Sequence, residues 1–167
     1  MTKNILEELP DTIEFWLKDT ANCPENVDLA RIRNATDLFQ EHGIAITFLL
    51  STSSLVNCYA ARTGVKVLTF SYRLGQNAYR RIAETGQFVL HVMAPGGLEP
   101  EGQGIKAIQK VRLMHSSIRH LVQKTGRWNE KENGIPICQE DLLGTLLTFS
   151  IVIINGLRHL GNPLLPQ

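Results

Sequence analysis

The sequence predicts an all-α fold, a single helical domain over residues 1–167, and three observations support this prediction. Apolar residues recur at three- and four-residue steps over most of the chain, which is the period of an amphipathic helix. Glycine and proline interrupt the pattern at intervals, and no internal repeat is visible. The composition, 43% hydrophobic and 20% charged, is that of a globular chain rather than a disordered one. We therefore expect helices around one core.

The first part of the chain predicts a series of helices with short breaks. A short amphipathic helix follows Pro10 and ends near residue 18, and a longer one covers 26–42, with Gly43 as its C-cap. A charge-free helix over 43–61 comes next. The stretch 65–72 is rich in β-branched and aromatic residues, but a lone strand would have no partner. A short helix or an extended linker is the favoured interpretation there.

The second part of the chain predicts three longer helices, over 77–94, 105–124 and 137–157. The loop 96–104 between the first two is rich in glycine but lacks the spacing of a phosphate-binding loop, and we interpret it as a structured turn. A polar linker precedes the last helix, with Pro136 at the helix start.

The charge-free segment 43–61 raises the question of a membrane span, because a span needs roughly 20 apolar residues. Its interior is polar for lipid, whereas a helix packed inside a helical domain satisfies such groups locally. A buried or partly buried helix is therefore favoured over a span, and a peripheral membrane contact stays open. The polar residues concerned are Thr47, Ser51, Thr52, Ser53, Ser54 and Asn57.

Charge and cysteine content exclude several classes of function. Seventeen Lys and Arg residues against sixteen Asp and Glu residues leave a net charge of +1, so we expect no nucleic-acid partner. Cys23, Cys58 and Cys138 are far apart and form no CxxC pair, which predicts neither a disulfide framework nor a zinc site. The N-terminus lacks the basic and then apolar pattern of a secretory signal. Together these features predict a cytoplasmic protein with reduced thiols.

One histidine interrupts the apolar stripe of the helix predicted at 105–124. His115 lies between Val111 and Ile118 on the inward face, so its imidazole is expected to point into the same interior. Such a histidine is either a core residue bonded to a carbonyl or a ligand, and the pattern alone favours the core residue. His120 lies roughly 140° further around the helix and is a poorer candidate.

The helix predicted at 77–94 carries a similar anomaly. Its inward stripe consists of Ala78, Ile82, Val89 and Val92. Arg81 and Thr85, one turn apart, share or border this stripe. A buried guanidinium requires a carboxylate, supplied by the protein or by a cofactor such as a haem through its propionate. The alternative is that Arg81 snorkels to the surface beside Arg80.

Four blocks within residues 79–161 carry a resemblance to a known family: TGQFVL, PGGLEP, KVRLMH and QEDLLGTLLTFS. Together they resemble the MpaB/rubber oxygenase (latex clearing protein-like) catalytic domain family, over about half of the chain. The resemblance implies a helical fold with part of a globin-like core at 77–161. It also implies a haem b cofactor, with its iron, and oxidative cleavage of a carbon–carbon double bond in an isoprenoid or similar apolar substrate by dioxygen.

The resemblance also implies roles for three residues. The histidine of the KVRLMH block is the proximal iron ligand of the family, and here it is His115. Arg81 and Thr85 match the arginine and threonine that lie near the haem and take part in catalysis in the family. The cofactor would thus supply the carboxylate that an inward Arg81 requires.

The chain departs from the family pattern at several points. Glu84 stands where a lysine approaches the distal side of the iron in latex clearing protein, and Cys138 replaces a polar amide. Family members continue beyond the helix that ends here near Gly161, so we expect an incomplete core. The alternative function is therefore a catalytically inactive, shortened member acting as a helical binding or interaction protein. Its uncovered apolar surface would then favour self-association.

Overall fold

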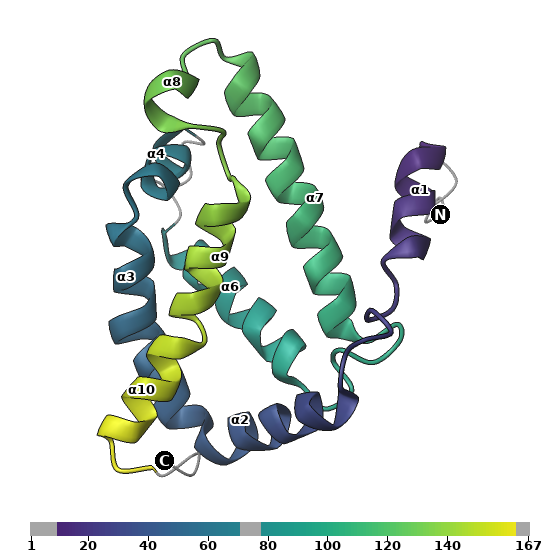
Figure 1. Ribbon diagram of the computed structural model, residues 1–167, viewed down its shortest axis with the longest axis vertical. Coiled ribbons are helices and arrows are strands. Elements are labelled where there is room, and N and C mark those ends of the chain that lie inside the picture. The colour runs from purple at the N-terminus through teal and green to yellow at the C-terminus, as the bar shows by residue number, and fades with distance from the viewer. Residues whose placement is uncertain (1–9, 71–77, 163–167) are drawn as a thin grey trace. The chain divides into compact units, whose positions relative to one another are not determined.

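The computed structural model describes residues 10–70 and 78–162, and this part of the chain is helical, without a strand (Figure 1). The all-α prediction is therefore confirmed. The chain divides into two compact units. Unit 1 consists of Met1–Asp37 and Ile82–Leu113, and unit 2 of Leu38–Arg81 and Met114–Gln167. Three helices, α2 (Leu29–Leu49), α6 (Ala78–Met93) and α7 (Gln103–Lys124), contribute residues to both units.

In unit 1, the short helix α1 (Asp11–Asp19) is held against the first half of α7 by polar contacts. The Gln109 amide, which is buried, donates hydrogen bonds to the Leu17 carbonyl at 2.8 Å and to the Thr20 hydroxyl at 2.9 Å. The guanidinium carbon of Arg112 lies 5.1 Å from the centre of the Trp16 ring, a cation–π distance. The predicted helix after Pro10 is thus present and ends one residue beyond the predicted position.

The glycine-rich loop of unit 1 is a compact turn in which backbone packs on backbone. The Gly97 amide donates to the Ala94 carbonyl at 2.8 Å, and the Ile105 amide donates to the Gly97 carbonyl at 3.1 Å. A Cβ atom on Gly104 would lie 2.6 Å from the Gly97 carbonyl oxygen, and Cβ atoms on Gly97 and Gly102 would also overlap carbonyl oxygens. The loop therefore requires glycine for close approach, in agreement with the predicted structured turn.

Unit 2 contains two clusters of buried residues. The first, which we call the α2–α10 cluster, joins α2 (Leu29–Leu49) and α10 (Ile151–His159) through Ile46, Leu49, Ile153 and Leu157. Leu157 is fully buried. Gly156 allows the close approach, because a Cβ atom there would lie 2.8 Å from Leu49 Cδ1.

The second cluster, which we call the Trp128 cluster, consists of Val67, Val122 and Trp128, with Phe70, Ile118 and Ile137 packed against it. Val67 and Phe70 come from α4 (Arg62–Phe70), so the part of the ambiguous stretch 65–72 that the structure describes is helical. Residues 71, 72 and 77 of the predicted segments lie outside the described residues. The rings of Phe70 and Trp128 meet edge to face at 5.4 Å between centroids.

The structure changes two of the predicted segments. The boundary predicted at 42/43 coincides with a kink in α2, because His42 has non-helical backbone angles (φ −111°, ψ 17°). Gly43 is not a left-handed C-cap, however, and α2 continues beyond the kink to Leu49. A π-helical turn, η2 (Leu50–Ser54), and α3 (Leu55–Ala60) prolong it. The helix predicted over 137–157 is broken at Ser150, since its backbone leaves the helical region (φ −121°, ψ −71°).

The predicted last helix is therefore two helices, α9 (Gln139–Thr148) and α10. It also begins later than predicted: Pro136 is buried in the preceding connection, and Cys138 is the N-cap. The polar linker before it contains a single turn, α8 (Glu130–Asn133), that the sequence did not predict. Asn129 caps this turn by accepting a hydrogen bond from the Lys131 amide.

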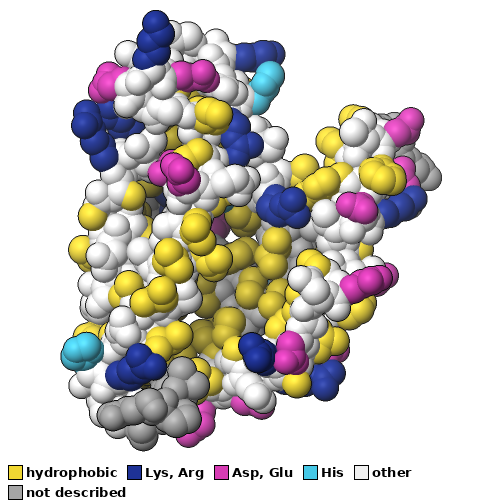
Figure 2. Space-filling view, viewed as in Figure 1, with side chains coloured by type: hydrophobic (Ala, Val, Ile, Leu, Met, Phe, Trp, Pro, Cys, Tyr) yellow, Lys and Arg dark blue, Asp and Glu magenta, His cyan; other side chains and the backbone are white. Residues whose placement is uncertain are grey.

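Two helical stretches are long and apolar enough to cross a membrane, Leu29–Ala60 and Gln139–His159. Length and composition alone do not separate a span from the core helix of a soluble protein. In the described structure only 17% and 11% of their most apolar windows are buried. Hydrophobic side chains lie at the surface over α9 and α10 (Figure 2). The partly buried helix expected at 43–61 thus has an exposed outer face, with Ile44 91% and Phe48 59% exposed.

Candidate functional site

His115 lies on α7, on the face that the sequence predicts. Ile105 and Val122 of the same stripe are buried, and Ile108, Val111 and Ile118 are half-buried. His115 is half-buried, whereas His120 is exposed. The helical period therefore distinguishes the two histidines correctly.

The surroundings of His115 favour the neutral imidazole. Burial lowers the pKa of His115 below its ordinary value, and the positive charge of Arg119, one turn later on α7, lowers it further. Neither ring nitrogen has a hydrogen-bond partner among the residues that the structure describes. At neutral pH the ring thus carries a lone pair that is free to bind a metal ion.

Arg81 is half-buried on the first turn of α6. Its Nη1 atom is buried, and no described residue accepts a hydrogen bond from it. The alternative from the sequence was that Arg81 extends its guanidinium to the surface. In the structure the guanidinium is not fully exposed, because its Nη1 atom is buried. An unpartnered guanidinium nitrogen away from water is costly, so an anionic group at this position would stabilise the site.

Thr85 follows Arg81 by one turn on α6 and is also half-buried. Arg81 and His115 both belong to unit 2, on two different helices, and Thr85 belongs to unit 1. Ile82, predicted in the inward stripe of the same helix, is 53% exposed, and this prediction is wrong. The apolar face of α6 instead consists of its later residues, since Val89 and Val92 are half-buried.

Two further polar atoms of unit 2 are buried without a hydrogen-bond partner among the described residues: Asp141 Oδ2 on α9 and Ser54 Oγ at the end of the π-helical turn. Sequence reasoning singled out neither one. The signal for Asp141 was its place in the QEDLLG block. Ser54 carried no local signal in the sequence, and the π-helical turn that contains it contacts α3 and α10.

No group of three or more His, Cys, Asp or Glu side chains suited to a metal ion occurs in the described part of the chain. The three cysteines are unpaired. A haem iron takes a single protein imidazole on its proximal side, so the relevant donor here is one histidine. His115 and the unpartnered nitrogen of Arg81 fit the two requirements of a haem, an axial ligand and a cation for a propionate.

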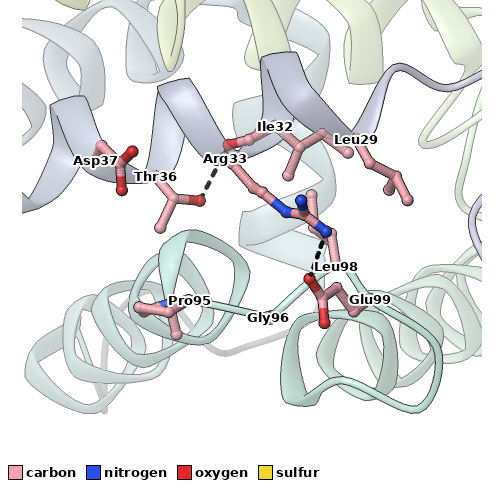
Figure 3. A pocket seen from close by; sticks show the side chains of 11 residues that line it. Leu29, Ile32, Arg33, Thr36, Asp37, Pro95, Gly96, Leu98 and Glu99 are labelled. Carbon is pink, nitrogen blue, oxygen red and sulfur yellow. Dashed lines mark hydrogen bonds and ion pairs between the residues drawn. The ribbon is translucent and has the colours of Figure 1, made fainter.

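A separate pocket lies within unit 1, between the first turns of α2 and the loop that follows α6 (Figure 3). Its volume of about 280 Å³ is at the lower limit of small-molecule sites, which span about 300–1,000 Å³. Arg33 Nη2 and Glu99 Oε1 face each other there at 3.5 Å, and the Thr36 hydroxyl donates back to the Ile32 carbonyl. None of the three predicted site residues lines it. We therefore place the candidate chemistry at His115 and Arg81, on the basis of their donor atoms.

Comparison with known protein families identifies one match, which covers residues 41–167. The matched family is described as ER-bound oxygenase mpaB/B'/rubber oxygenase, catalytic domain. The chain belongs to this family. The match includes His115, Arg81 and Thr85, and it begins in α2, well before the blocks that carried the resemblance in the sequence.

A curated relative is the rubber oxygenase of Streptomyces sp. (strain K30), which is 22% identical over 155 residues. The alignment covers 92% of this chain but only 38% of the relative. No solved structure matches the chain significantly. The chain is thus a member of an oxygenase family. It spans well under half the length of this relative.

Proposed function

We propose that this chain binds haem b through His115 and forms the haem-holding part of an oxygenase. The reaction would be oxidative cleavage of a carbon–carbon double bond in an isoprenoid or similar apolar substrate by dioxygen. The observation that carries the proposal is the half-buried imidazole of His115 on an apolar helix face, where burial lowers its pKa. Family membership supports the class of reaction.

The three residues have different tasks in this proposal. His115 binds the iron with the lone pair that its low pKa keeps available. Arg81 receives an anionic propionate at its buried Nη1, which supplies the missing hydrogen-bond partner. Thr85, one turn after Arg81 on the same helix, would contribute a hydroxyl and a methyl group. When bound, the haem supplies the dioxygen chemistry, and the protein supplies the ligand, the orientation and the exclusion of water.

The test is an absorption titration of the purified chain with haem. We expect a Soret band that saturates at one haem per chain, and loss of that band in His115→Ala. His120→Ala, on the exposed side of the same helix, is the matched control and should keep the band. A Soret band that is unchanged in His115→Ala would contradict the assignment of the ligand.

Turnover needs a separate measurement. Oxygen uptake by the haem-loaded protein with short polyprenols should depend on Arg81 and Thr85. Arg81→Lys keeps the charge but loses the planar donor geometry, so we expect weaker haem binding than in the wild type. Haem-loaded protein that consumes no oxygen would instead favour the second candidate function, a catalytically inactive interaction protein. The exposed apolar residues of α9 are the observation that favours this candidate.

We also propose that the apolar outer face of α3, α9 and α10 makes a peripheral contact with a lipid bilayer, where an apolar substrate would be concentrated. Residues 43–61 and 142–157 carry no charge. Cys58 Sγ lies 2.8 Å from Thr148 Oγ1, so the two charge-free stretches pack against each other. The exposed side chains on these three helices include Val56, Leu143, Leu146 and Ile151.

Three of the hydroxyl groups on these stretches, those of Ser51, Thr52 and Thr145, do not oppose such a contact. Ser51 and Thr52 donate to the Phe48 carbonyl at 2.9 and 2.7 Å, and Thr145 donates to the Asp141 carbonyl at 2.9 Å. Because these three hydroxyls are satisfied within their own helices, their exposure to lipid leaves no donor unpaired. A peripheral contact, which the sequence left open, is compatible with these hydroxyls.

Flotation with vesicles of neutral phosphatidylcholine tests the contact. The wild-type chain should float with the vesicles, and Leu143→Glu with Leu146→Glu should remain at the bottom of the gradient. A wild-type chain that stays at the bottom and elutes as a dimer in size-exclusion chromatography would overturn the membrane contact in favour of self-association.

A further inference from the structure

The connection between α8 and α9 has an unusual backbone. Gly134 and Ile137 both have positive φ values, 67° and 55°. Glycine adopts this conformation freely, but Ile137 is β-branched, and its side chain opposes it. Pro136, between them, is fully buried. A strained residue of this kind persists only when its surroundings hold it in place.

Arg119 is the side chain that holds this connection. Its Nε donates to the Pro136 carbonyl at 3.1 Å, and its Nη2 donates to the Ile137 carbonyl at 2.7 Å. The planar guanidinium thus spans two consecutive carbonyl groups, which the single ammonium of a lysine does not reproduce. Trp128 Nε1 donates to the Gly134 carbonyl at 2.7 Å, and the Ile137 side chain packs on the Trp128 cluster.

The bonds from Arg119 also determine where α9 begins. Cys138, the residue after Ile137, is the N-cap of α9, and its Sγ accepts a hydrogen bond from the Asp141 amide. The first turn of α9 therefore starts at a backbone position that Arg119 fixes. Asp141, with its buried and unpartnered Oδ2, belongs to this turn.

Arg119 acts on His115 as well, because the two residues are one turn apart on α7. No described carboxylate lies within ion-pair distance of the guanidinium, which donates hydrogen bonds to two backbone carbonyls. Its positive charge is therefore not neutralised locally, and the two carbonyls keep it near the imidazole.

We propose that Arg119 is a positioning residue for the His115 site: it fastens the start of α9 to α7 through two carbonyl groups, and it holds an unneutralised positive charge one turn from the ligand. The second half of this proposal rests on the proposed function of His115. The charge should favour ferrous over ferric haem, because it opposes further positive charge at the iron.

Two variants separate the geometry from the charge. Arg119→Lys keeps the charge but loses the pair of carbonyl bonds, and Arg119→Met loses both. Arg112→Met is the matched control, since Arg112 lies on the same helix but over the Trp16 ring. The two readouts are backbone hydrogen exchange at residues 139–142, without haem, and the reduction potential of the haem-loaded chain.

In both Arg119 variants we expect exchange at 139–142 to rise about tenfold, in line with the loss of one or two hydrogen bonds. In Arg112→Met it should not change. The reduction potential should fall in Arg119→Met and stay closer to the wild-type value in Arg119→Lys.

If hydrogen exchange at residues 139–142 is as slow in Arg119→Lys as in the wild type, the role of the two carbonyl bonds is overturned. Equal potentials in wild type and Arg119→Met would overturn the role of the charge. If the wild-type chain binds no haem, the proposed function and the second half of this proposal fail together, while the exchange measurement still decides the first half.

Discussion

The two buried clusters of unit 2 are built by different physical means. The α2–α10 cluster consists of aliphatic side chains brought together by a close helix contact at Gly156. The Trp128 cluster is smaller, and polar side chains around it donate to backbone carbonyls: Trp128 to Gly134, and Arg119 to Pro136 and Ile137. The first cluster is stabilised by close packing and buried apolar area, and the second is stabilised by hydrogen bonds as well.

The two clusters therefore differ in how precisely they fix the position of the backbone. Apolar contacts tolerate small shifts of one helix along another, whereas a pair of hydrogen bonds fixes a backbone to within a few tenths of an ångström. His115 lies on α7 between Val111 and the Trp128 cluster residue Ile118. The directional bonds thus occur on the helix that carries the candidate ligand, where position matters most.

The largest expected effect breaks the α2–α10 cluster. Leu157→Ala removes a fully buried side chain, and we expect a loss of about 2–5 kcal/mol in the free energy of unfolding, measured by urea denaturation. Leu146→Ala, at a position that is 62% exposed, should change it by less than about 0.5 kcal/mol. Equal losses in the two variants would mean that this cluster is not a core.

A smaller effect should follow from filling the helix contact. In Gly156→Ala the new methyl group overlaps the side chain of Leu49, and we expect a cost of about 1–3 kcal/mol from overpacking. Gly144→Ala is the matched control on α9, because a Cβ atom there meets nothing within 4 Å. It should stabilise the helix by about 0.5–1 kcal/mol. A Gly156→Ala variant as stable as this control would contradict the close approach.

The Trp128 cluster is best tested through its directional bonds. Trp128→Phe keeps an aromatic ring next to Phe70 but loses the donor to the Gly134 carbonyl, so we expect a cost of about 0.5–1.5 kcal/mol. Thermal unfolding, followed by circular dichroism, measures it. Since α8 ends at Gly134, increased protease cleavage near residues 130–134 should accompany the loss. Unchanged stability and cleavage would assign this cluster to packing alone.

The smallest effect concerns pH. The pKa of His115 in the folded chain is below the value in the unfolded chain, so below about pH 6.5 the unfolded state binds more protons. Stability should therefore fall as the pH drops below about 6.5, and the fall should level off below the folded pKa. His115→Gln should weaken this dependence, and His120→Gln, exposed, should not. If wild type and His115→Gln lose the same amount of stability as the pH falls, the lowered pKa of His115 is contradicted.

The sequence predicted those parts of the molecule that follow from periodicity. The inward face of α7 and the contrast between His115 and His120 came from a single helical stripe. The boundary predicted at 42/43 coincides with the kink at His42. The break at Ser150 was not predicted, because it occurs inside a long apolar run whose local propensities continue the helix.

The residues of the candidate site also fall into those that the sequence predicted and those that it did not. His115, Arg81 and Thr85 were identified from polar residues on apolar faces and from the resemblance of their surrounding blocks. Arg119 was missed because its partners are backbone carbonyls 17 and 18 residues away, which no side-chain pattern records. The buried Oδ2 of Asp141 was missed for a related reason, since burial of one atom depends on neighbours from other elements.

The glycine-rich loop of unit 1 has a consequence for how this family is recognised. Carbonyl oxygens occupy the space that a side chain would need at Gly97, Gly102 and Gly104. A saturation mutagenesis experiment would therefore find these positions intolerant even in an assay that measures only protein abundance. Gly97 of the PGGLEP block, with Gly102 and Gly104 after it, is thus required by backbone shape, and a chain that has lost the reaction would still need these glycines.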